Sequence, residues 1–386
     1  MYAKLNILPA LLALLALGSA AHADDTLQTR VDETIRPLMT EHDIAGMAVA
    51  ITYNGQAHYF NYGVARMDDP QPVSSDTLFE IGSLSKPLTA TLAALAQATG
   101  KLTLADSAGQ HWPELQGSQL EHASLLNLGT YTAGGLPLQF PDSVTDPANM
   151  LAYYRQWQPE YAAGTHRRYS NPSIGLLGML AAKSMGQPFP TLMEGTLFPA
   201  LGMSHSYIQV PTAQLPRYAF GYSKDNQPLR VTPGMLDAEA YGVKTTARDM
   251  LRFVQANLNP AGLNKDLQRA IAMTHTGYYR VGEMTQGLGW ERYPYPISLE
   301  RLQAGNSPAM ALESQPATRL APPESEPSDS LFNKTGSTGG FGAYAVFVPS
   351  QNLGLVMLAN KNYPNAARIK AAHAILSALD KNAAPH

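Results

Sequence analysis

Runs of apolar residues between polar segments predict strands toward both ends of the chain. Near the amino end, two apolar, aromatic-rich runs at residues 46–53 and 57–64 are joined by an Asn-Gly pair, which is typical of a tight hairpin turn. Two more β-rich runs, at residues 341–349 and 353–360, flank a short turn near the carboxyl end. We therefore expect two antiparallel hairpins that are far apart in the sequence.

Helical spacing of apolar residues dominates the middle of the chain. Leucines three or four residues apart predict a helix that begins near Ser83 and stops at Gly100. Pro172 and Gly186 bound a second helical stretch, and Asn171 is in the position of its N-terminal cap. The helices expected are residues 83–99, 173–185, 246–258 and 364–379.

The order of these elements predicts the fold class. Strands, a helical middle, strands and a final helix follow one another with few β–α–β alternations, which favours an α+β architecture. We expect an antiparallel β-sheet flanked by helices, plus a mostly helical lobe. Residues 305–330 are rich in Pro, Ser, Glu and Ala, so they are predicted to form a long surface loop.

The first 23 residues have the features of a secretory signal peptide. Lys4 precedes an apolar run at residues 7–17, and Ala21-His22-Ala23 places small residues at a cleavage position. The run is too short to span a bilayer. We expect residues 1–23 to be removed, so that the mature chain begins at Asp24, is not attached to a membrane and lies in the periplasm of a bacterial cell.

Composition argues against several classes of function. Of the 27 Lys and Arg residues only Lys4 lies in the signal segment, so 26 remain against 30 Asp and Glu, and no basic run suggests nucleic-acid binding. The chain has no cysteine, which excludes disulfides and thiol catalysis. The ten histidines form no His-x-x-x-His pair, so no metal site and no cofactor is expected.

Ser83 and Lys86 place a hydroxyl and an amine one helical turn apart at the start of a predicted buried helix. Residues three apart share a helix face. A lysine whose pKa is lowered by burial could therefore deprotonate the serine without a histidine. The alternative is that Ser83 is an ordinary helix cap.

Two further motifs follow, Tyr-Ser-Asn at residues 169–171 and Lys-Thr-Gly at residues 334–336. With Ser-x-x-Lys they resemble, in order, the three signatures of the penicillin-recognising serine hydrolases. Tyr-Ser-Asn in the second place resembles the class C β-lactamases, the cephalosporinases. The similarity extends over nearly the whole mature chain, including residues 78–82, 134–139, 237–242 and 360–364.

This resemblance implies a fold and an activity. One catalytic domain of two lobes would cover residues 24–386, with the amino- and carboxyl-terminal parts sharing one sheet and the helical lobe inserted between them. The activity would be hydrolysis of the β-lactam ring through a serine acyl-enzyme. Cephalosporins would be preferred, and the protein would act as a monomer that confers resistance to these antibiotics.

The resemblance also assigns catalytic roles. Ser83 would be the nucleophile, Lys86 its neighbouring amine and Tyr169 the proton shuttle. Two nearby lysines would favour the phenolate of Tyr169 because they carry positive charge. They would therefore lower its pKa below the ordinary phenol value of about 10. Lys334, expected on an edge strand beside the serine, would bring positive charge into the cleft. The oxyanion hole would be formed by the backbone N–H groups of Ser83 and Ser337.

A further set of residues would bind the substrate. By the same resemblance, Gln139 and Asn171 would bind the amide side chain of the substrate, and Asn365 and Arg368 would bind its carboxylate. Tyr241 would form an aromatic wall, Thr335 would supply a hydroxyl group, and Gly336 would let the substrate backbone approach closely.

Two alternatives share these motifs. A D,D-peptidase or esterase differs from a β-lactamase chiefly in how fast its acyl-enzyme is hydrolysed, and the motifs specify acylation only. A non-catalytic β-lactam sensor would acylate and remain acylated. No stretch after the signal segment is long and apolar enough to span a membrane, which argues against the sensor.

Overall fold

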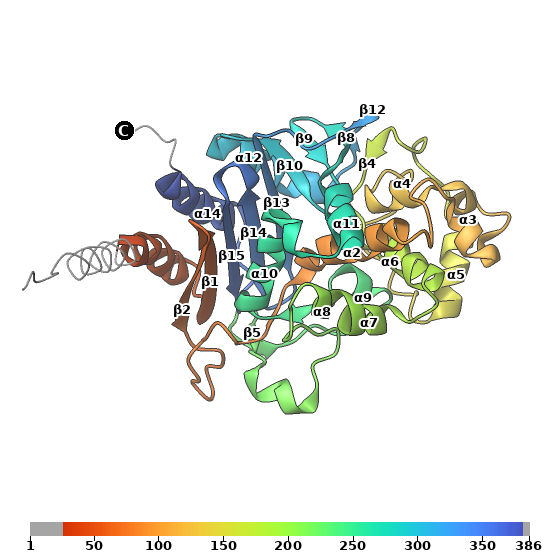
Figure 1. Ribbon diagram of the computed structural model, residues 1–386. Coiled ribbons are helices and arrows are strands. Elements are labelled where there is room, and N and C mark those ends of the chain that lie inside the picture. Colours follow the sequence, from red (N-terminus) through yellow and green to blue (C-terminus); the bar gives the residue numbers. More distant parts are fainter. Residues whose placement is uncertain (1–25, 381–386) are drawn as a thin grey trace, which may run out of the picture.

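A computed structural model describes residues 26–380. Its centre is a nine-stranded antiparallel sheet to which both ends of the chain contribute (Figure 1). In order across the sheet, the strands are β12 (Thr318–Glu324), β8 (Gly277–Val281), β9 (Met284–Gln286), β10 (Glu291–Pro294), β13 (Ser330–Ser337), β14 (Gly342–Val348), β15 (Leu353–Ala359), β1 (Gly46–Tyr53) and β2 (Gln56–Gly63).

Both predicted hairpins are confirmed. β1 pairs with β2 around Asn54 and Gly55, whose φ angles of 53° and 76° lie in the left-handed region that these residue types tolerate. β14 pairs with β15, and every residue of these two strands is buried. β1 also pairs with β15, so the amino-terminal hairpin completes the sheet begun by the carboxyl-terminal strands.

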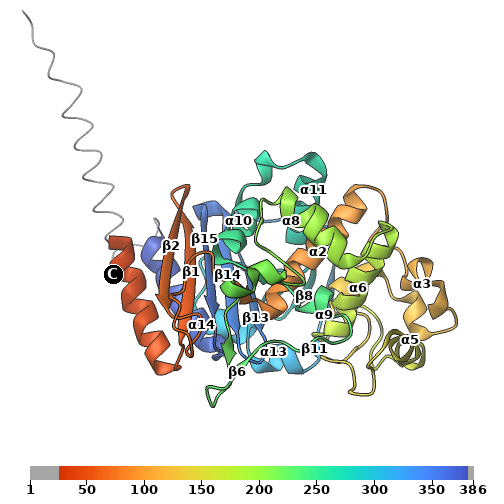
Figure 2. The same ribbon diagram turned by 90° about the horizontal axis from the view of Figure 1, so that it is seen from below.

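Helices cover both faces of the sheet. The helix over residues 26–41 and α14 (Asn365–Leu379) lie on one face, whereas α2 (Lys86–Ala98), α10 (Ala247–Leu258) and α11 (Lys265–His275) lie on the other (Figures 1 and 2). α2 is the most deeply placed of these, because every residue from Lys86 to Ala96 is buried.

The remaining helices mostly form a lobe beside the sheet, around α2 (Figure 1). They are α3 (Ala108–His111), α4 (Leu125–Gly129), α5 (Pro147–Gln156), α6 (Asn171–Ser184), α7 (Phe189–Leu192), α8 (Phe198–Ala200) and α9 (Asp237–Ala240), with α12 (Leu299–Gly305) and α13 (Pro308–Leu312) near the sheet. Three two-stranded pairs complete the fold: β3 (Phe79–Glu80) with β7 (Lys244–Thr245), β4 (His166–Arg167) with β11 (Gln315–Pro316), and β5 (Gly221–Tyr222) with β6 (Pro228–Leu229).

The predicted α+β class is therefore confirmed, and so are the four helices apart from their first residues. Thr246 caps α10, because its hydroxyl accepts a hydrogen bond from the Asp249 backbone N–H at 3.1 Å. None of the helices in residues 26–380 is long and apolar enough to cross a membrane. The predicted signal peptide at residues 1–23 and the chain start at Asp24 lie outside the described residues.

Three local predictions were wrong. Residues 305–330 are not one loop, since they contain α13, β11 and β12; an exposed edge strand such as β12 tolerates the prolines that suggested a loop. Asn171 is not the cap of α6, because Ser170 Oγ accepts the Ser173 backbone N–H at 3.1 Å. Finally, β13 is not an edge strand, since it lies between β10 and β14.

The environment of Lys334 explains part of that last error. β10 pairs with β13 only as far as Asn333, so residues 334–337 are paired with β14 alone. The segment that carries the Lys-Thr-Gly motif therefore has one unpaired side within an interior strand.

Candidate active site

Ser83 lies in a single 3₁₀ turn, η1 (Gly82–Ser85), that leads directly into α2. Lys86 is the first residue of α2, and its Nζ donates a hydrogen bond to Ser83 Oγ at 2.8 Å. Ser83 is partly exposed, whereas Lys86 is completely buried. The hydroxyl can therefore meet a ligand, while the amine acts from within the protein.

Two glycines bring the Ser83 turn against β13. A Cβ atom on Gly82 would lie 2.3 Å from the Ser337 carbonyl oxygen, and one on Gly336 would lie 2.0 Å from the Ile81 carbonyl oxygen. Gly82 also has a φ of 50°, which favours glycine. The backbones of Ser83 and Ser337 can come side by side only because residues 82 and 336 are glycines.

The Lys86 ammonium is held by three acceptors from different elements. Besides Ser83, its Nζ donates to Asn171 Oδ1 at 2.6 Å and to the Ala240 carbonyl oxygen at 2.9 Å. Burial lowers the pKa of Lys86 to about 8, and the nearby Lys334 acts in the same direction. At neutral pH this amine is therefore much closer to losing its proton than an exposed lysine.

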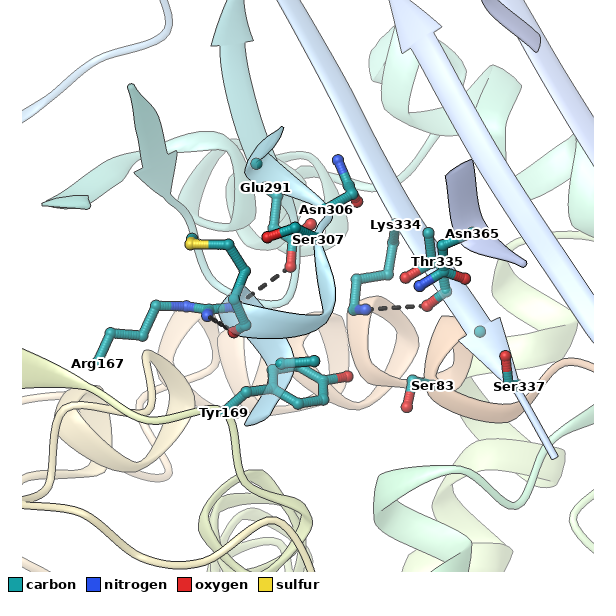
Figure 3. Close-up of a pocket in the computed structure, with 14 residues that line it drawn as sticks. Ser83, Arg167, Tyr169, Glu291, Asn306, Ser307, Lys334, Thr335, Ser337 and Asn365 are labelled. Atoms are coloured by element: carbon teal, nitrogen blue, oxygen red, sulfur yellow. Dashed lines mark hydrogen bonds and ion pairs between the residues drawn. The ribbon is translucent and has the colours of Figure 1, made fainter. Parts of the chain in front are cut away.

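Tyr169 lies between the two lysines. The Nζ atoms of Lys86 and Lys334 are each 5.0 Å from the centre of its ring. Figure 3 shows the phenol pointing toward Ser83 and Lys334. Burial by itself would raise the pKa of Tyr169, but the charges of Lys334 and Lys86 outweigh it and lower the pKa to about 8.

The side chains of Ser83, Tyr169 and Lys334 border a pocket of about 150 Å³ (Figure 3). Thr335 and Asn365 also line it, and Lys334 Nζ donates to the Thr335 carbonyl oxygen at 2.9 Å. Its described lining is Ser83, Arg167, Tyr169, Glu291, Gly305, Asn306, Ser307, Met310, Ala311, Lys334, Thr335, Gly336, Ser337 and Asn365.

Four of the expected binding residues are not among those that line this pocket. One is Asn171, whose Oδ1 accepts the hydrogen bond from Lys86. Gln139 is exposed beside Leu138, whose carbonyl oxygen accepts the Asn171 backbone N–H at 2.9 Å. Tyr241 is half-buried and directly follows Ala240, the carbonyl partner of Lys86. Both are thus tied through neighbouring backbone to residues around Lys86, although their side chains do not border the pocket itself.

Arg368 is the fourth, and its guanidinium lies against the end of β13. Its guanidinium is completely buried and donates to the carbonyl oxygens of Gly336 at 2.6 Å and Ala343 at 3.3 Å, and to Ser337 Oγ at 3.0 Å. A cation whose donors are committed in this way supports the end of β13.

Sequence reasoning missed two charged residues of the pocket, Arg167 and Glu291. They form a buried ion pair in which Arg167 Nη2 lies 3.3 Å from Glu291 Oε1. Arg167 lies two residues before Tyr169, which is the one local signal that could have drawn attention to it. Glu291 is in no motif, so only the fold shows that it belongs to the site.

Comparison with known proteins identifies the family. The family model described as Beta-lactamase matches residues 31–380. The chain belongs to the β-lactamase family. A curated Beta-lactamase from Pseudomonas fluorescens is 60% identical to it over 351 residues, which cover 91% of this chain and 98% of that protein.

Solved structures agree with the family assignment. A class C β-lactamase in complex with cefoxitin has a TM-score of 0.90 at 48% identity, and the match covers 92% of this chain and 99% of that one. A protein described as Beta-Lactamase/D-Alanine Carboxypeptidase from Pseudomonas syringae has a TM-score of 0.90 at 49% identity, covering 93% and 100%. The predicted family is therefore confirmed, and this β-lactamase has the fold of the class C enzymes.

Proposed function

We propose that this β-lactamase opens the β-lactam ring through an acyl-enzyme on Ser83 and that cephalosporins are its preferred substrates. The observation that carries the proposal is the 2.8 Å contact between Ser83 Oγ and Lys86 Nζ, next to a tyrosine flanked by two lysines. This arrangement supplies a nucleophile, a proton acceptor and positive charge within one pocket.

In the acylation step, the Ser83 oxygen attacks the lactam carbonyl carbon and its proton passes to the Lys86–Tyr169 pair. The backbone N–H groups of Ser83 and Ser337 stabilise the oxyanion. When the carbon–nitrogen bond breaks, Tyr169 returns the proton to the leaving nitrogen. Because both members of the pair have a pKa near 8, the proton can move in either direction at little cost.

In the deacylation step, the same pair removes a proton from water as the water attacks the ester of Ser83. The ester bond breaks, Ser83 recovers its proton, and the opened antibiotic leaves. Asn171 and Gln139 contact the substrate's amide side chain, Tyr241 forms an aromatic wall, and Gly336 allows the substrate backbone to approach β13. Asn365, which lines the pocket, and Arg368, which donates to Ser337, are the groups for the carboxylate, and Thr335 supplies a hydroxyl.

A second candidate function is D-alanine carboxypeptidase activity. The name of the Pseudomonas syringae structure favours it, because that protein is described as both a β-lactamase and a D-alanine carboxypeptidase. Both reactions need the same acylation step. Hydrolysis of a D-alanyl-D-alanine peptide by the purified protein, and its loss in Ser83→Ala, would establish this activity beside lactam hydrolysis.

The decisive experiment counts turnovers of a chromogenic cephalosporin per active site. Sustained turnover that is lost in Ser83→Ala supports the proposal, and mass mapping after a slow β-lactam should place the adduct on Ser83 alone. One stoichiometric burst followed by a stall would instead identify a sensor. We also propose that the mature protein begins at Asp24, is monomeric and acts in the periplasm, which N-terminal sequencing and sedimentation would test.

A further inference from the structure

Arg167 occupies an unusual position behind the site. It is only 1% exposed, and its Cζ lies 5.4 Å from the ring centre of Tyr169 and 5.3 Å from that of Tyr131. The two rings are themselves 4.9 Å apart. The guanidinium therefore packs against the rings of both Tyr169, the proposed proton shuttle, and its neighbour Tyr131. Figure 3 shows Arg167 beside Tyr169.

The partners of Arg167 come from the opposite side of the pocket. Its Nε donates to Gln286 Oε1 at 2.7 Å, its Nη1 to the Met310 carbonyl oxygen at 2.8 Å, and its Nη2 to Glu291 Oε1 at 3.3 Å. Gln286 and Glu291 are cross-strand neighbours on β9 and β10. Because such neighbours share a sheet face, their oxygens form a ready-made acceptor pair for one guanidinium.

The orientation of that acceptor pair is itself fixed. Gln286 Nε2 donates to the carbonyl oxygens of Gly287 at 3.0 Å and Trp290 at 3.3 Å, so its Oε1 is left facing Arg167. Arg167 thus joins the segment that carries Tyr169 to the sheet that carries Lys334. This link sets where the phenol ring stands relative to β13.

Charge gives the pair a second effect. Glu291 is the single acid among the described residues that line the pocket, where the cations are Arg167 and Lys334. Burial and the two lysines have the larger influence on Tyr169, but Glu291 opposes the lysines and raises the pKa of the phenol. Glu291 likewise raises the pKa of Lys86, against the larger effect of burial.

We propose that Arg167 and Glu291 are a positioning pair for Tyr169, in which the arginine fixes the ring and the carboxylate limits the positive charge around it. The inference rests on the proposed role of Tyr169 as the proton shuttle. The charged and titratable groups that face Tyr169 are Lys86 from α2, Lys334 from β13, Glu291 from β10, Arg167 from β4 and Tyr131 from the segment after α4.

The test titrates Tyr169 directly by NMR on protein labelled with ¹³C at tyrosine Cζ. The signal absent from Tyr169→Phe identifies the residue. Glu291→Gln removes a negative charge and should lower the titration midpoint by about one pH unit. Arg167→Gln leaves that carboxylate without its counter-charge and should raise the midpoint by a similar amount. The acidic limb of kcat/KM for a chromogenic cephalosporin should move in the same directions.

Two further variants separate positioning from general damage. Arg167→Lys keeps the cation but cannot span all three acceptors, so it should lower kcat about tenfold or more while leaving the midpoint near the wild-type value. Glu324→Gln breaks another arginine–glutamate pair. Arg292 is the neighbour of Glu291 on β10, and its Nη2 lies 3.1 Å from Glu324 Oε2 on β12. As a matched control, Glu324→Gln should leave the Tyr169 midpoint unchanged.

Opposite shifts in Glu291→Gln and Arg167→Gln support the proposal, since a merely structural pair would not separate the two variants by sign. A Glu291→Gln midpoint equal to or above that of wild type overturns it. The proposed shuttle is tested separately: if Tyr169→Phe still hydrolyses the cephalosporin at the wild-type rate, the shuttle is wrong, whatever the titrations show.

Discussion

Two sides of the active site, the helix wall and the strand wall, each hold a lysine at the same distance from Tyr169 but in a different way. The helix wall consists of Ser83, Lys86 and Asn171, and the strand wall consists of Lys334, Thr335 and Ser337. Both lysine Nζ atoms lie 5.0 Å from the centre of the Tyr169 ring. Lys86 donates to three acceptors, whereas the described residues offer Lys334 one, the carbonyl oxygen of Thr335.

This difference separates two tasks that one charge could not perform. The hydrogen bonds of Lys86 are all within the protein, which suits a group that exchanges a proton with Ser83 and Tyr169. Lys334 lines the pocket with one hydrogen bond among the described residues, which suits a group that meets a ligand. The helix wall is thus organised by contacts within the protein, and in the proposed mechanism the strand wall meets the substrate.

Removing the hydroxyl group of Tyr169, which lies between the two walls, should have the largest effect on activity. Tyr169→Phe keeps the ring packed between the two lysines but removes the exchangeable proton, so kcat should fall by about 10³-fold or more with the fold intact. Tyr131→Phe is a matched control, because the Tyr131 ring lies 4.9 Å from that of Tyr169. Loss of the Tyr131 hydroxyl should cost little activity. Pre-steady-state kinetics would show which step slows; equal rates in the two variants would contradict the shuttle.

Lys334→Ala tests the strand wall alone. The cation acts on charge that develops as the ring opens, so we expect a loss of about 10²-fold or more in kcat/KM with a smaller change in substrate binding. The helix wall should be unaffected, and burst kinetics on a slow β-lactam should still label Ser83. Near-normal turnover would show that Lys334 only supports β13, and the division of tasks would then fail.

Gly82→Ala tests the contact between the walls. A Cβ atom there would be 2.3 Å from the Ser337 carbonyl oxygen, so the Ser83 turn must move away from β13, and kcat/KM should fall about tenfold or more. Gly100→Ala is the control, because Gly100 also has a positive φ, of 71°, but nothing lies near its Cβ position. It should cost about 1 kcal/mol of stability and no activity. Equal kinetics in both variants would contradict the argument.

Much of the helix wall could be predicted because its residues are neighbours in sequence. Ser83 and Lys86 are one turn apart, and helical spacing of leucines placed that turn at the start of a buried helix. Both hairpins were also predictable, since short turns and apolar, β-rich runs are local features. Tyr169 and Lys334 needed the order of motifs in a known family, because nothing local distinguishes them from other tyrosines and lysines.

The rest depends on contacts between distant segments. Arg167 and Glu291 are separated by 124 residues, and only the pairing of β9 with β10 brings Gln286 and Glu291 to the same guanidinium. The burial of Arg368 against β13 could not be predicted for the same reason, since it is a tertiary feature. A periodic pattern reports which face of an element is buried but does not report what that face meets.

The smallest expected effect is a pH dependence of stability to which both walls contribute. Lys86 and Tyr169 have a pKa of about 8 in the folded protein, below the ordinary values of 10.5 and 10.0. Between pH 8 and 10 the unfolded chain therefore holds protons that the folded protein has released, so the free energy of unfolding should rise with pH. Above this window, buried tyrosines with raised pKa values, such as Tyr344, act in the opposite direction.

Urea unfolding of wild type and Lys334→Gln across this window provides the measurement. Lys334 is the strongest of the charges that lower the pKa of Tyr169, so its removal should return that pKa toward 10 and reduce the rise in stability. Lys361→Gln is a control that removes a lysine paired with Asp43, away from the pocket. If the rise is the same in Lys334→Gln as in wild type, the strand wall has no influence on the proton held by Tyr169, and the two walls act independently.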